Sequence, residues 1–438
     1  MATRSRRTGV IAVRRSDLFL PASRETRGAG AETTKLLERA GLVRGFGSGL
    51  WGLTPAGQRV REKVIGRIRA GMDRVGAQAV HLPGLQYRER WEESGRWGSF
   101  EDEMFTLRNR EDRDVCLAPS HEEGTVHLLD GAVRSYADLP VMVYQVAAKF
   151  RDDHARNGLV RCKEFTMKDA YSFHADEAGL RETYRAVRAE YGRIFADLGL
   201  DVAVVEAEAD VMGGSRSEEF VAPVENGSDR LVHCTDDDCR FGVTDEHPGF
   251  DDHEAGGTCP DCGGSLAGSE GIEVGHVFEL GTRYSGAMGL TVDDAEGRER
   301  EVPMGSYGIG VERLLQTVAE QHADAGDDDG GLRWPVTDWG SIAPYRAAVI
   351  PIGEDDVVRE TAEALHEACG REDVLLYDDL AVGERFAESD LLGIPAKVVV
   401  GNRYRDTGLV DLERRDGETR QVDPDRVPDL VAEFAAGG

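Results

Sequence analysis

The segment KFRDDHARNGLVRCKEFTMKDAYSFH, from Lys149 to His174, contains the end of one apolar run, a polar loop with several arginines, and a second apolar run. The preceding MVYQVAA and the following EFTMKDAYSF are rich in the aromatic and β-branched residues that favour strands. We therefore predict two neighbouring strands joined by this loop. Arg151 stands inside the strand pair, where its guanidinium is a rigid cation for an anionic group. The alternative for an isolated strand arginine is a surface salt bridge.

Further strands and helices are predicted on both sides of this segment. Short apolar runs alternate with polar loops between 76 and 175, which predicts a mostly antiparallel sheet. Residues 31–75 predict helices, the first ending at Gly41, and 177–198 predict another. MGSYGIGVERLLQTVAEQH (304–322) predicts a glycine turn that opens a helix. The second helix has an apolar face with a period of about 3.6 residues, formed by Val60, Val64, Ile65, Ile68 and Met72.

The pattern changes near Pro344, after a linker that contains Pro and Trp. From there strands alternate with helices, which indicates a separate α/β domain over 345–438. The predicted fold class is therefore α+β, with an antiparallel sheet flanked by helices over 16–344. Residues 1–15 are expected to form an N-terminal extension.

The composition excludes several classes of protein. The 438 residues are 40% hydrophobic, enough for a packed core, so the chain is not disordered as a whole. Lys and Arg number 52 against 82 Asp and Glu, and a net charge of −30 excludes a generic nucleic-acid coat but not a local basic face. No run approaches the roughly 20 apolar residues of a membrane span. We expect a cytoplasmic protein without a membrane segment.

Seven cysteines are too few for a disulfide scaffold in a chain of this length. Four form two close pairs, Cys234-x4-Cys239 and Cys259-x2-Cys262, within a Gly- and Asp-rich stretch. Such pairs favour a structural zinc ion in a ribbon-like insert over 230–268, and four thiolates leave no open position for catalysis. The alternative is four reduced thiols in a loop.

Three blocks give the chain a family resemblance. GAQAVHLP (76–83), the segment 149–174 and GSYGIGVERLL (305–315) resemble motifs 1, 2 and 3 of class II aminoacyl-tRNA synthetases. LFLPASRET, WEESGRW, APSHEEG, MKDAYSFH and LLGIP are similar to the bacterial-type prolyl-tRNA synthetases. The resemblance runs from about residue 16 to the C-terminus. It implies a class II catalytic domain, a C-terminal anticodon-binding domain and a homodimer formed around motif 1.

The resemblance also implies a reaction and its site. Proline and ATP would give prolyl-adenylate with Mg²⁺, and the prolyl group would pass to tRNA(Pro), by positioning and charge stabilisation. The implied catalytic residues are Arg151 and Arg313. The implied ATP-binding residues are Arg151, Asp153, Glu164, Phe165, Gly308, Gly310 and Arg313. The implied amino-acid-binding residues are Ser120, Glu122, Arg151, His174, His276 and Ser306.

Several of these residues also have plainer interpretations. Ser120 followed by Glu123 is a capping box for a helix N-terminus, and both roles can hold together. A single histidine such as His174 or His276 is more often structural than functional. Arg385, Lys397, Arg403 and Arg405 could contact tRNA phosphates or could form a solvated face.

The chain departs from the family pattern in two ways. Asp153 stands for a usual Glu, Ser120 for Thr, Ser306 for Cys and Glu279 for Gln. The stretch between motifs 2 and 3 is too short for the editing insertion that bacterial-type enzymes commonly carry. We therefore expect no editing in the chain itself, with correction by a separate protein.

Two other functions stay open at this stage. One is a paralogue that loads an amino acid onto another carrier, and the second is a non-catalytic regulator that binds tRNA. The intact Arg151 and Arg313 argue against the regulator, and the C-terminal domain argues against the other carrier.

Overall fold

The computed structural model describes residues 12–23, 31–100, 103–207, 212–236, 238–322, 330–353, 355–415 and 417–435. They fall into two compact units. The larger unit comprises Gly45–Trp51 and Arg61–Gln321, and the smaller comprises Met1–Arg44, Gly52–Val60 and His322–Gly438. No helix in these described ranges combines the length and apolar character needed to cross a membrane.

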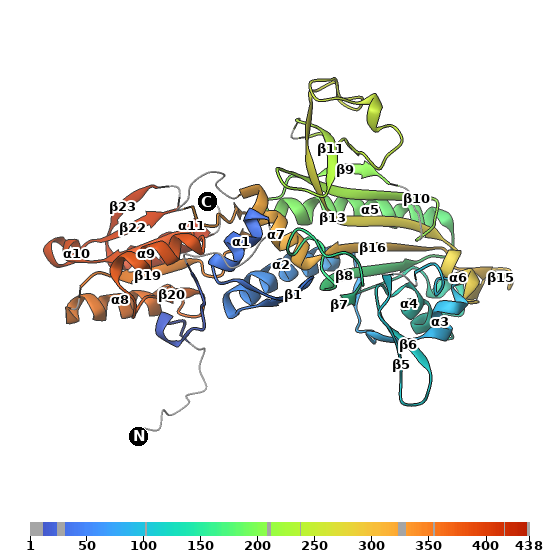
Figure 1. Cartoon of the computed structure of the whole chain (residues 1–438), viewed down its shortest axis with the longest axis horizontal. Coiled ribbons are helices and arrows are strands. Elements are labelled where there is room, and N and C mark those ends of the chain that lie inside the picture. The colour runs from blue at the N-terminus through green and yellow to red at the C-terminus, as the bar shows by residue number, and fades with distance from the viewer. Residues whose placement is uncertain are drawn as a thin grey trace. The chain divides into compact units, whose positions relative to one another are not determined.

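A nine-stranded sheet forms the centre of the larger unit (Figure 1). Its main path is β12-β11-β13-β16-β8-β7-β3, and β10 pairs with both β13 and β9. The strands are β3 (Gln78–Ala79), β7 (Val141–Phe150), β8 (Glu164–Phe173), β9 (Ala203–Glu206), β10 (Arg216–Val224), β11 (Asp229–Cys234), β12 (Gly242–Thr244), β13 (Leu266–Gly281) and β16 (Met304–Gly310). Among the described strand pairs of this central sheet, only β3 with β7 is parallel.

The two strands of the opening segment form as predicted. β7 and β8 pair over their full length, from Val141 opposite Phe173 to Phe150 opposite Glu164. The long helix α5 (Glu177–Asp197) confirms the prediction for 177–198 and packs on β13, β16 and β8 (Figure 1). Its Asp176 cap accepts a hydrogen bond from the backbone N–H of Gly179, which fixes the start of the helix.

The prediction of a glycine turn before the third motif helix is wrong. Met304–Gly310 is the central strand β16, hydrogen-bonded to β13 on one side and to β8 on the other, and α7 (Val311–His322) follows directly. Two complete rows of backbone hydrogen bonds outweigh the weak strand propensity of glycine. The consequence is that Ser306 is held between two neighbouring strands.

Short elements complete the larger unit. The runs expected at 103–109 and 114–119 belong to a separate three-stranded sheet, because β6 pairs with β4 and β5 instead of with the central sheet. These elements are β4 (Leu85–Tyr87), α3 (Arg88–Glu93), β5 (Thr106–Arg108), β6 (Asp114–Leu117), α4 (Glu122–Leu129), η3 (Tyr136–Asp138), η4 (Phe250–Asp252), α6 (Arg283–Ala287), β14 (Thr291–Asp293) and β15 (Glu299–Glu301).

Both helices expected between 31 and 75 are present, as α1 (Glu32–Arg39) and α2 (Pro55–Arg74). All five predicted apolar positions of α2 are buried. The hairpin between the helices, β1 (Val43–Gly47) with β2 (Leu50–Leu53), was not predicted, because its glycines and exposed Phe46 give no alternating pattern.

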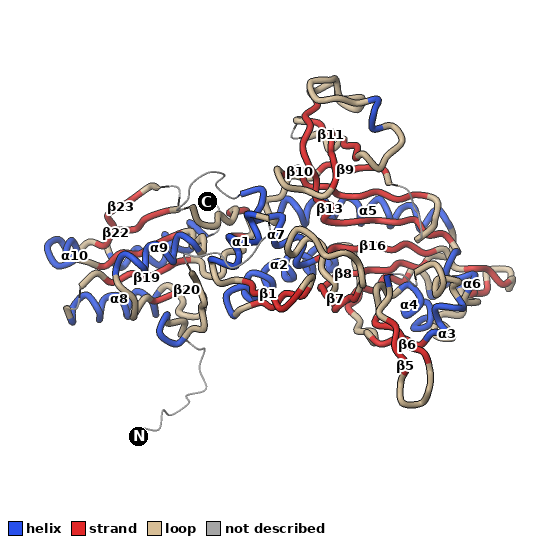
Figure 2. The backbone as a smooth tube through the Cα atoms, viewed as in Figure 1, coloured by secondary structure: helices blue, strands red, loops and turns tan. Residues whose placement is uncertain are grey.

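The smaller unit contains the α/β pattern expected at the C-terminus (Figure 2). Its five-stranded sheet has the order β20-β19-β21-β22-β23, with β19 parallel to β20 and β21. Its elements are η1 (Arg15–Asp17), β17 (Val336–Thr337), β18 (Gly340–Ser341), β19 (Ala347–Pro351), α8 (Asp356–Ala368), β20 (Val374–Leu376), α9 (Val382–Leu391), β21 (Ala396–Val400), α10 (Asn402–Thr407), β22 (Val410–Arg414), β23 (Thr419–Val422), η5 (Pro424–Arg426) and α11 (Val427–Ala435).

Two glycines of α2 provide a test of its packing. A Cβ at Gly57 would lie 2.0 Å from the carbonyl oxygen of Leu42, whereas a Cβ at Gly66 would meet no atom within 4 Å. Gly57→Ala should lower the free energy of unfolding by about 1–3 kcal/mol through overpacking. Gly66→Ala, the control, should raise it by about 0.4–1 kcal/mol. Denaturant unfolding measures both changes, and equal effects would contradict the described approach of α2 to Leu42.

Candidate active site

A fully buried arginine, Arg96, lies at the centre of a charged cluster. Its Nη1 donates to Oε2 of Glu122 at 3.1 Å and to both carboxylate oxygens of Glu123 at 3.2 Å. Its Nη2 donates to Oγ of Ser120 at 3.0 Å. One guanidinium therefore holds three side chains at the start of α4, as buried charges require.

Aromatic rings surround the Arg96 guanidinium. The centroids of Trp91, Phe100 and Tyr284 lie 4.7, 4.9 and 5.3 Å from its Cζ. These rings exclude water and hold the cation in place by cation–π attraction. Although burial opposes the charged form, Glu123 and Glu122 raise the pKa of Arg96 above its ordinary value.

The second oxygen of Glu122 is held from the central sheet. Ser306 on β16 donates its Oγ hydrogen bond to Oε1 of Glu122 at 3.0 Å. Burial opposes ionisation of Glu122, but Arg96 and hydrogen bonds from Ser120 and Ser306 outweigh it and lower its pKa. The structure thus brings together Ser120, Glu122 and Ser306, and it favours the carboxylate form of Glu122.

The predicted capping box at Ser120 is wrong. α4 begins at Glu122 with His121 as its N-cap, and no side chain makes the capping hydrogen bond. Arg96 takes up both groups that a capping box would use, the hydroxyl of Ser120 and the carboxylate of Glu123. A charged donor forms a stronger hydrogen bond than a backbone N–H, so the cluster replaces the cap.

Arg151 follows the end of β7 and has no strong partner. Its Nε and Nη2 lie 3.4 Å from the carbonyl oxygen of Pro119, and no described carboxylate lies within 4 Å of its guanidinium. Burial, followed by the charge of Arg313, lowers its pKa. The Phe165 ring lies 5.6 Å from its Cζ. This cation can accept an anionic ligand without breaking an ion pair.

Arg313, in the first turn of α7, is held by three contacts. Its Nε donates to the carbonyl oxygen of Val160 at 2.8 Å, and its Nη1 donates to Oε2 and O of Glu273 at 2.6 and 3.0 Å. The Glu273 pKa is held well below its usual range because Arg313 and His276 outweigh the effect of burial. The charge of Arg313 also lowers the pKa of Arg151, so the two cations lie near each other.

Beside Arg313 lies a group of possible cation ligands. One ligand atom each from Glu219, Glu273 and His276 lies within 4.8 Å of the others. Nε2 of His276 is 2.5 Å from Oγ of Ser217, and its ring stacks on Phe278 with centroids 3.8 Å apart. Burial and the neighbouring Glu273 raise the pKa of Glu219 to about 9. A divalent cation would relieve this repulsion.

The other histidine predicted for the amino-acid pocket, His174, is buried directly after the end of β8. No hydrogen bond or ion pair of a described residue joins His174 to the Arg96 cluster, and its Nε2 has no hydrogen-bond partner. Burial lowers its pKa to about 4, so the ring is neutral near pH 7. The sequence alone did not show that Ser306 hydrogen-bonds to Glu122 whereas His174 has no described bond to this cluster.

The remaining residues predicted for ATP lie on β8, on β16 and in the loop between β7 and β8. Phe165 is half-buried near Arg151, and Glu164 is exposed at the start of β8. The carboxylate of Asp153 pairs with Nε of Arg161 at 2.5 Å. A Cβ at Gly308 or Gly310 would have its nearest neighbour at 3.6 or 3.5 Å, an ordinary contact. Packing alone therefore does not require these two glycines.

The four predicted metal cysteines meet at the end of β11. Sγ of Cys234 is 3.5 Å from that of Cys262, Sγ of Cys239 is 3.7 Å from that of Cys259, and all four lie within 4.8 Å. These separations exceed the roughly 2.05 Å of a disulfide and suit a tetrahedral thiolate site. The predicted grouping of the four thiols is confirmed.

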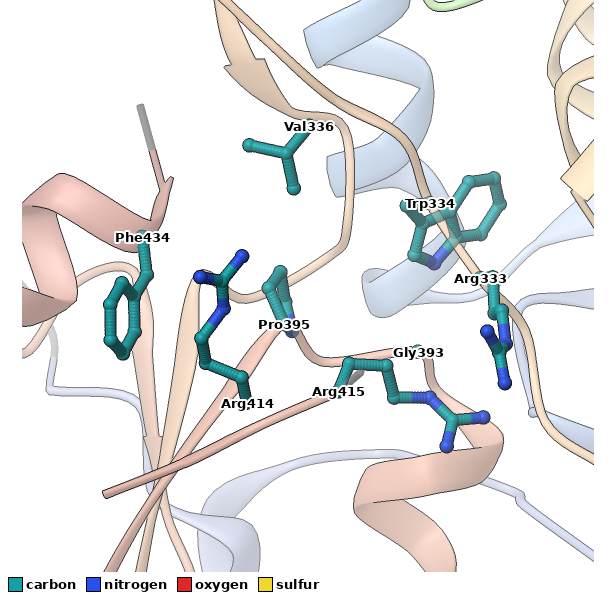
Figure 3. Close-up of a pocket in the computed structure, with 8 residues that line it drawn as sticks. All are labelled: Arg333, Trp334, Val336, Gly393, Pro395, Arg414, Arg415 and Phe434. Atoms are coloured by element: carbon teal, nitrogen blue, oxygen red, sulfur yellow. The ribbon is translucent and has the colours of Figure 1, made fainter. Parts of the chain in front are cut away.

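The smaller unit has its own basic cavity. The residues predicted for phosphate contacts are engaged, since Arg385 donates to backbone carbonyls and Lys397 pairs with Asp390. A cavity of about 180 Å³ lies elsewhere in this unit (Figure 3). It is lined by Arg333, Trp334, Val336, Gly393, Pro395, Arg414, Arg415 and Phe434. The sequence did not predict this grouping of arginines and aromatic rings, because the residues come from segments that are far apart in the sequence.

Comparisons with known proteins agree with this architecture. A family model, the tRNA synthetase class II core domain (G, H, P, S and T), matches 105–322, and the anticodon binding domain model matches 346–434. The fold is similar to a crystal structure of prolyl-tRNA synthetase from Cryptosporidium parvum complexed with L-proline and AMP. The TM-score is 0.70 at 17% identity, over 92% of this chain and 75% of that chain. The chain therefore has the fold of a class II aminoacyl-tRNA ligase.

Sequence relatives identify the family within that class. The proline–tRNA ligase of Methylobacterium radiotolerans is 37% identical over 438 residues, covering 93% of this chain and 97% of the relative. The proline–tRNA ligase of Methylobacterium sp. (strain 4-46) is 36% identical over 455 residues, covering 97% and 100%. The chain belongs to the proline–tRNA ligase family, which confirms the resemblance found in the sequence.

The relatives differ in length. The proline–tRNA ligase of Moorella thermoacetica aligns over 553 positions at 32% identity, with 92% of this chain and 95% of the relative covered. This chain has only 438 residues, so the longer alignment contains residues that it lacks. The short chain agrees with the absence of an editing insertion.

Proposed function

We propose that this chain activates proline with ATP and transfers the prolyl group to tRNA(Pro). The observation that carries the proposal is that a buried carboxylate, Glu122, lies near the Arg151 guanidinium, which has no ion pair with a described residue. Glu122 would bind the secondary ammonium of proline, and Arg151 would bind the charge at the α-phosphate. Ser120 and Ser306 orient Glu122 through hydrogen bonds.

The chemistry follows from this arrangement. The proline carboxylate attacks the α-phosphorus, the bond to pyrophosphate breaks, and no protein nucleophile takes part. Arg151 stabilises the negative charge that develops on the phosphoryl oxygens, and Arg313 would hold the leaving phosphates. Glu219, Glu273 and His276 would hold Mg²⁺, which neutralises phosphate charge.

The remaining ATP residues have supporting roles in the proposal. Phe165 offers a ring face beside Arg151 for the adenine, and Gly308 and Gly310 leave the strand backbone open to the nucleotide. Asp153 and Glu164 lie at the two ends of the loop that joins β7 to β8, where they can contact the adenine amino group. His174 is proposed to shape the amino-acid pocket as a neutral ring.

We further propose the domain and assembly assignments that the family implies. Residues 16–344 would form the catalytic domain with the insert 230–268, after an extension over 1–15, and 345–438 would bind the anticodon. A homodimer would use the two-residue strand β3, which ends the path of the central sheet and leaves an edge for pairing. The chain would act in the cytoplasm.

Substitution of Arg151 tests the proposed activation step. Arg151→Lys should lower the rate of proline-dependent ATP–pyrophosphate exchange by at least about 100-fold, because lysine cannot form the bidentate hydrogen bonds that arginine makes with a phosphate. Folding should be little affected, since among the described residues the guanidinium forms no ion pair and its hydrogen bonds are the 3.4 Å contacts with Pro119. Glu122→Gln should instead raise the KM for proline more than the KM for ATP. Near-normal exchange in folded Arg151→Lys would reject the assignment.

We also propose that the four-cysteine cluster holds one structural zinc ion. Protein purified without chelator should contain one zinc per chain by elemental analysis. Cys262→Ser should remove the ion, because three thiolates bind it less tightly than four. Cys369→Ala, a buried thiol in the smaller unit, should keep it. Chain without zinc after such a purification would reject the proposal.

The absence of an editing insertion predicts a defect in proofreading. A pocket sized for proline excludes larger side chains but admits alanine, since missing methylenes cost only about 1–3 kcal/mol each. The purified chain should therefore leave preformed alanyl-tRNA(Pro) intact, and a separate protein would have to hydrolyse it. Deacylation clearly faster than the spontaneous rate would show that the chain edits after all.

A further inference from the structure

Glu122 shares its cation with a second buried carboxylate. Arg96 donates to Glu122 at 3.1 Å and to both oxygens of Glu123 at 3.2 Å, and Ser94 donates to Oε1 of Glu123 at 2.7 Å. With both carboxylates ionised, the three groups carry a net charge of −1. The neighbouring Lys149 and Asp169 pair with each other at 2.8 Å and add no net charge. Arg151 is also near Glu122, but its charge is assigned to the phosphate in the proposed function.

This imbalance has a consequence for the substrate. A one-to-one pair of Arg96 with Glu122 would be neutral and would offer little attraction to an ammonium group. Glu123 competes for the same guanidinium and takes up part of its charge. The three rings around Arg96 keep the guanidinium from turning away from the carboxylates. Their packing therefore holds Arg96 in contact with both Glu122 and Glu123.

We propose that Arg96 and Glu123 are positioning residues for the amino acid. Arg96 orients Glu122, and Glu123 leaves Glu122 with the net negative charge that a secondary ammonium group requires. The inference rests on the proposed role of Glu122. Burial, and less so the charge of Glu122, raises the pKa of Glu123, and a cation bound at the site favours its ionised form.

Glu123→Gln tests the proposal, because it removes the charge and keeps the shape of the side chain. The KM for proline in ATP–pyrophosphate exchange should rise by roughly tenfold, while the KM for ATP changes less than about twofold. The inhibition constant of tetrahydrofuran-2-carboxylate should also change by less than about twofold. This analogue has a ring oxygen in place of the ammonium and therefore senses the shape of the pocket without its charge.

Two further variants keep the test decisive. Ser94→Ala serves as the test variant if Glu123→Gln does not fold. It removes one donor to Glu123 from a half-buried position and should raise the KM for proline by about two- to threefold. Glu190→Gln is the matched control, because Glu190 is equally buried but pairs with Arg74 outside the site. It should change neither constant.

The outcomes separate this inference from the function on which it rests. An equal rise for proline and the analogue in Glu123→Gln, or no rise for either, would overturn the positioning role. Wild-type chain that does not activate proline, or Glu122→Gln with an unchanged KM for proline, would overturn the proposed function and the inference with it.

Discussion

The ion cluster around Arg96 is the interaction on which the amino-acid side of the proposed site depends. One fully buried guanidinium binds Glu122, Glu123 and Ser120 inside a cage of three aromatic rings. Charges removed from water are stable only when they are paired, and loss of one partner of a buried pair costs about 3–5 kcal/mol. The contacts that stabilise the start of α4 therefore also orient the Glu122 carboxylate so that it accepts the hydrogen bond from Ser306.

The central sheet supplies the phosphate side of the proposed site. β16 lies between β13 and β8, so it places Ser306 beside Glu122 and leads directly into α7 with Arg313. β7 ends just before Arg151, whose guanidinium has no ion pair among the residues described. The proposed reaction needs an ammonium site and a phosphate site close together. Ser306 on β16 holds Glu122 of α4, Arg151 follows β7, and only β8 separates these two strands in the sheet.

Much of this was predictable from local sequence patterns. The apolar runs rich in aromatic and β-branched residues on both sides of the 151–163 loop predicted β7 and β8, and the cysteine spacing predicted the cluster of four thiols. The role of Arg96 was not predictable, because an arginine in WEESGRW has the same local pattern whether it is exposed or enclosed by rings. β16 was mistaken for a turn, since its strand pairing comes from distant segments that no local propensity reports.

The most direct measurement is a crystal structure of the chain with a non-hydrolysable prolyl-adenylate analogue. The account predicts the ring nitrogen of the prolyl group within about 3.2 Å of a Glu122 carboxylate oxygen. It also predicts two hydrogen bonds from Arg151 to the group that replaces the phosphate. The account would be contradicted if the prolyl nitrogen bound away from Glu122 while Arg96 and Glu123 kept their described contacts and the space beside Glu122 stayed empty.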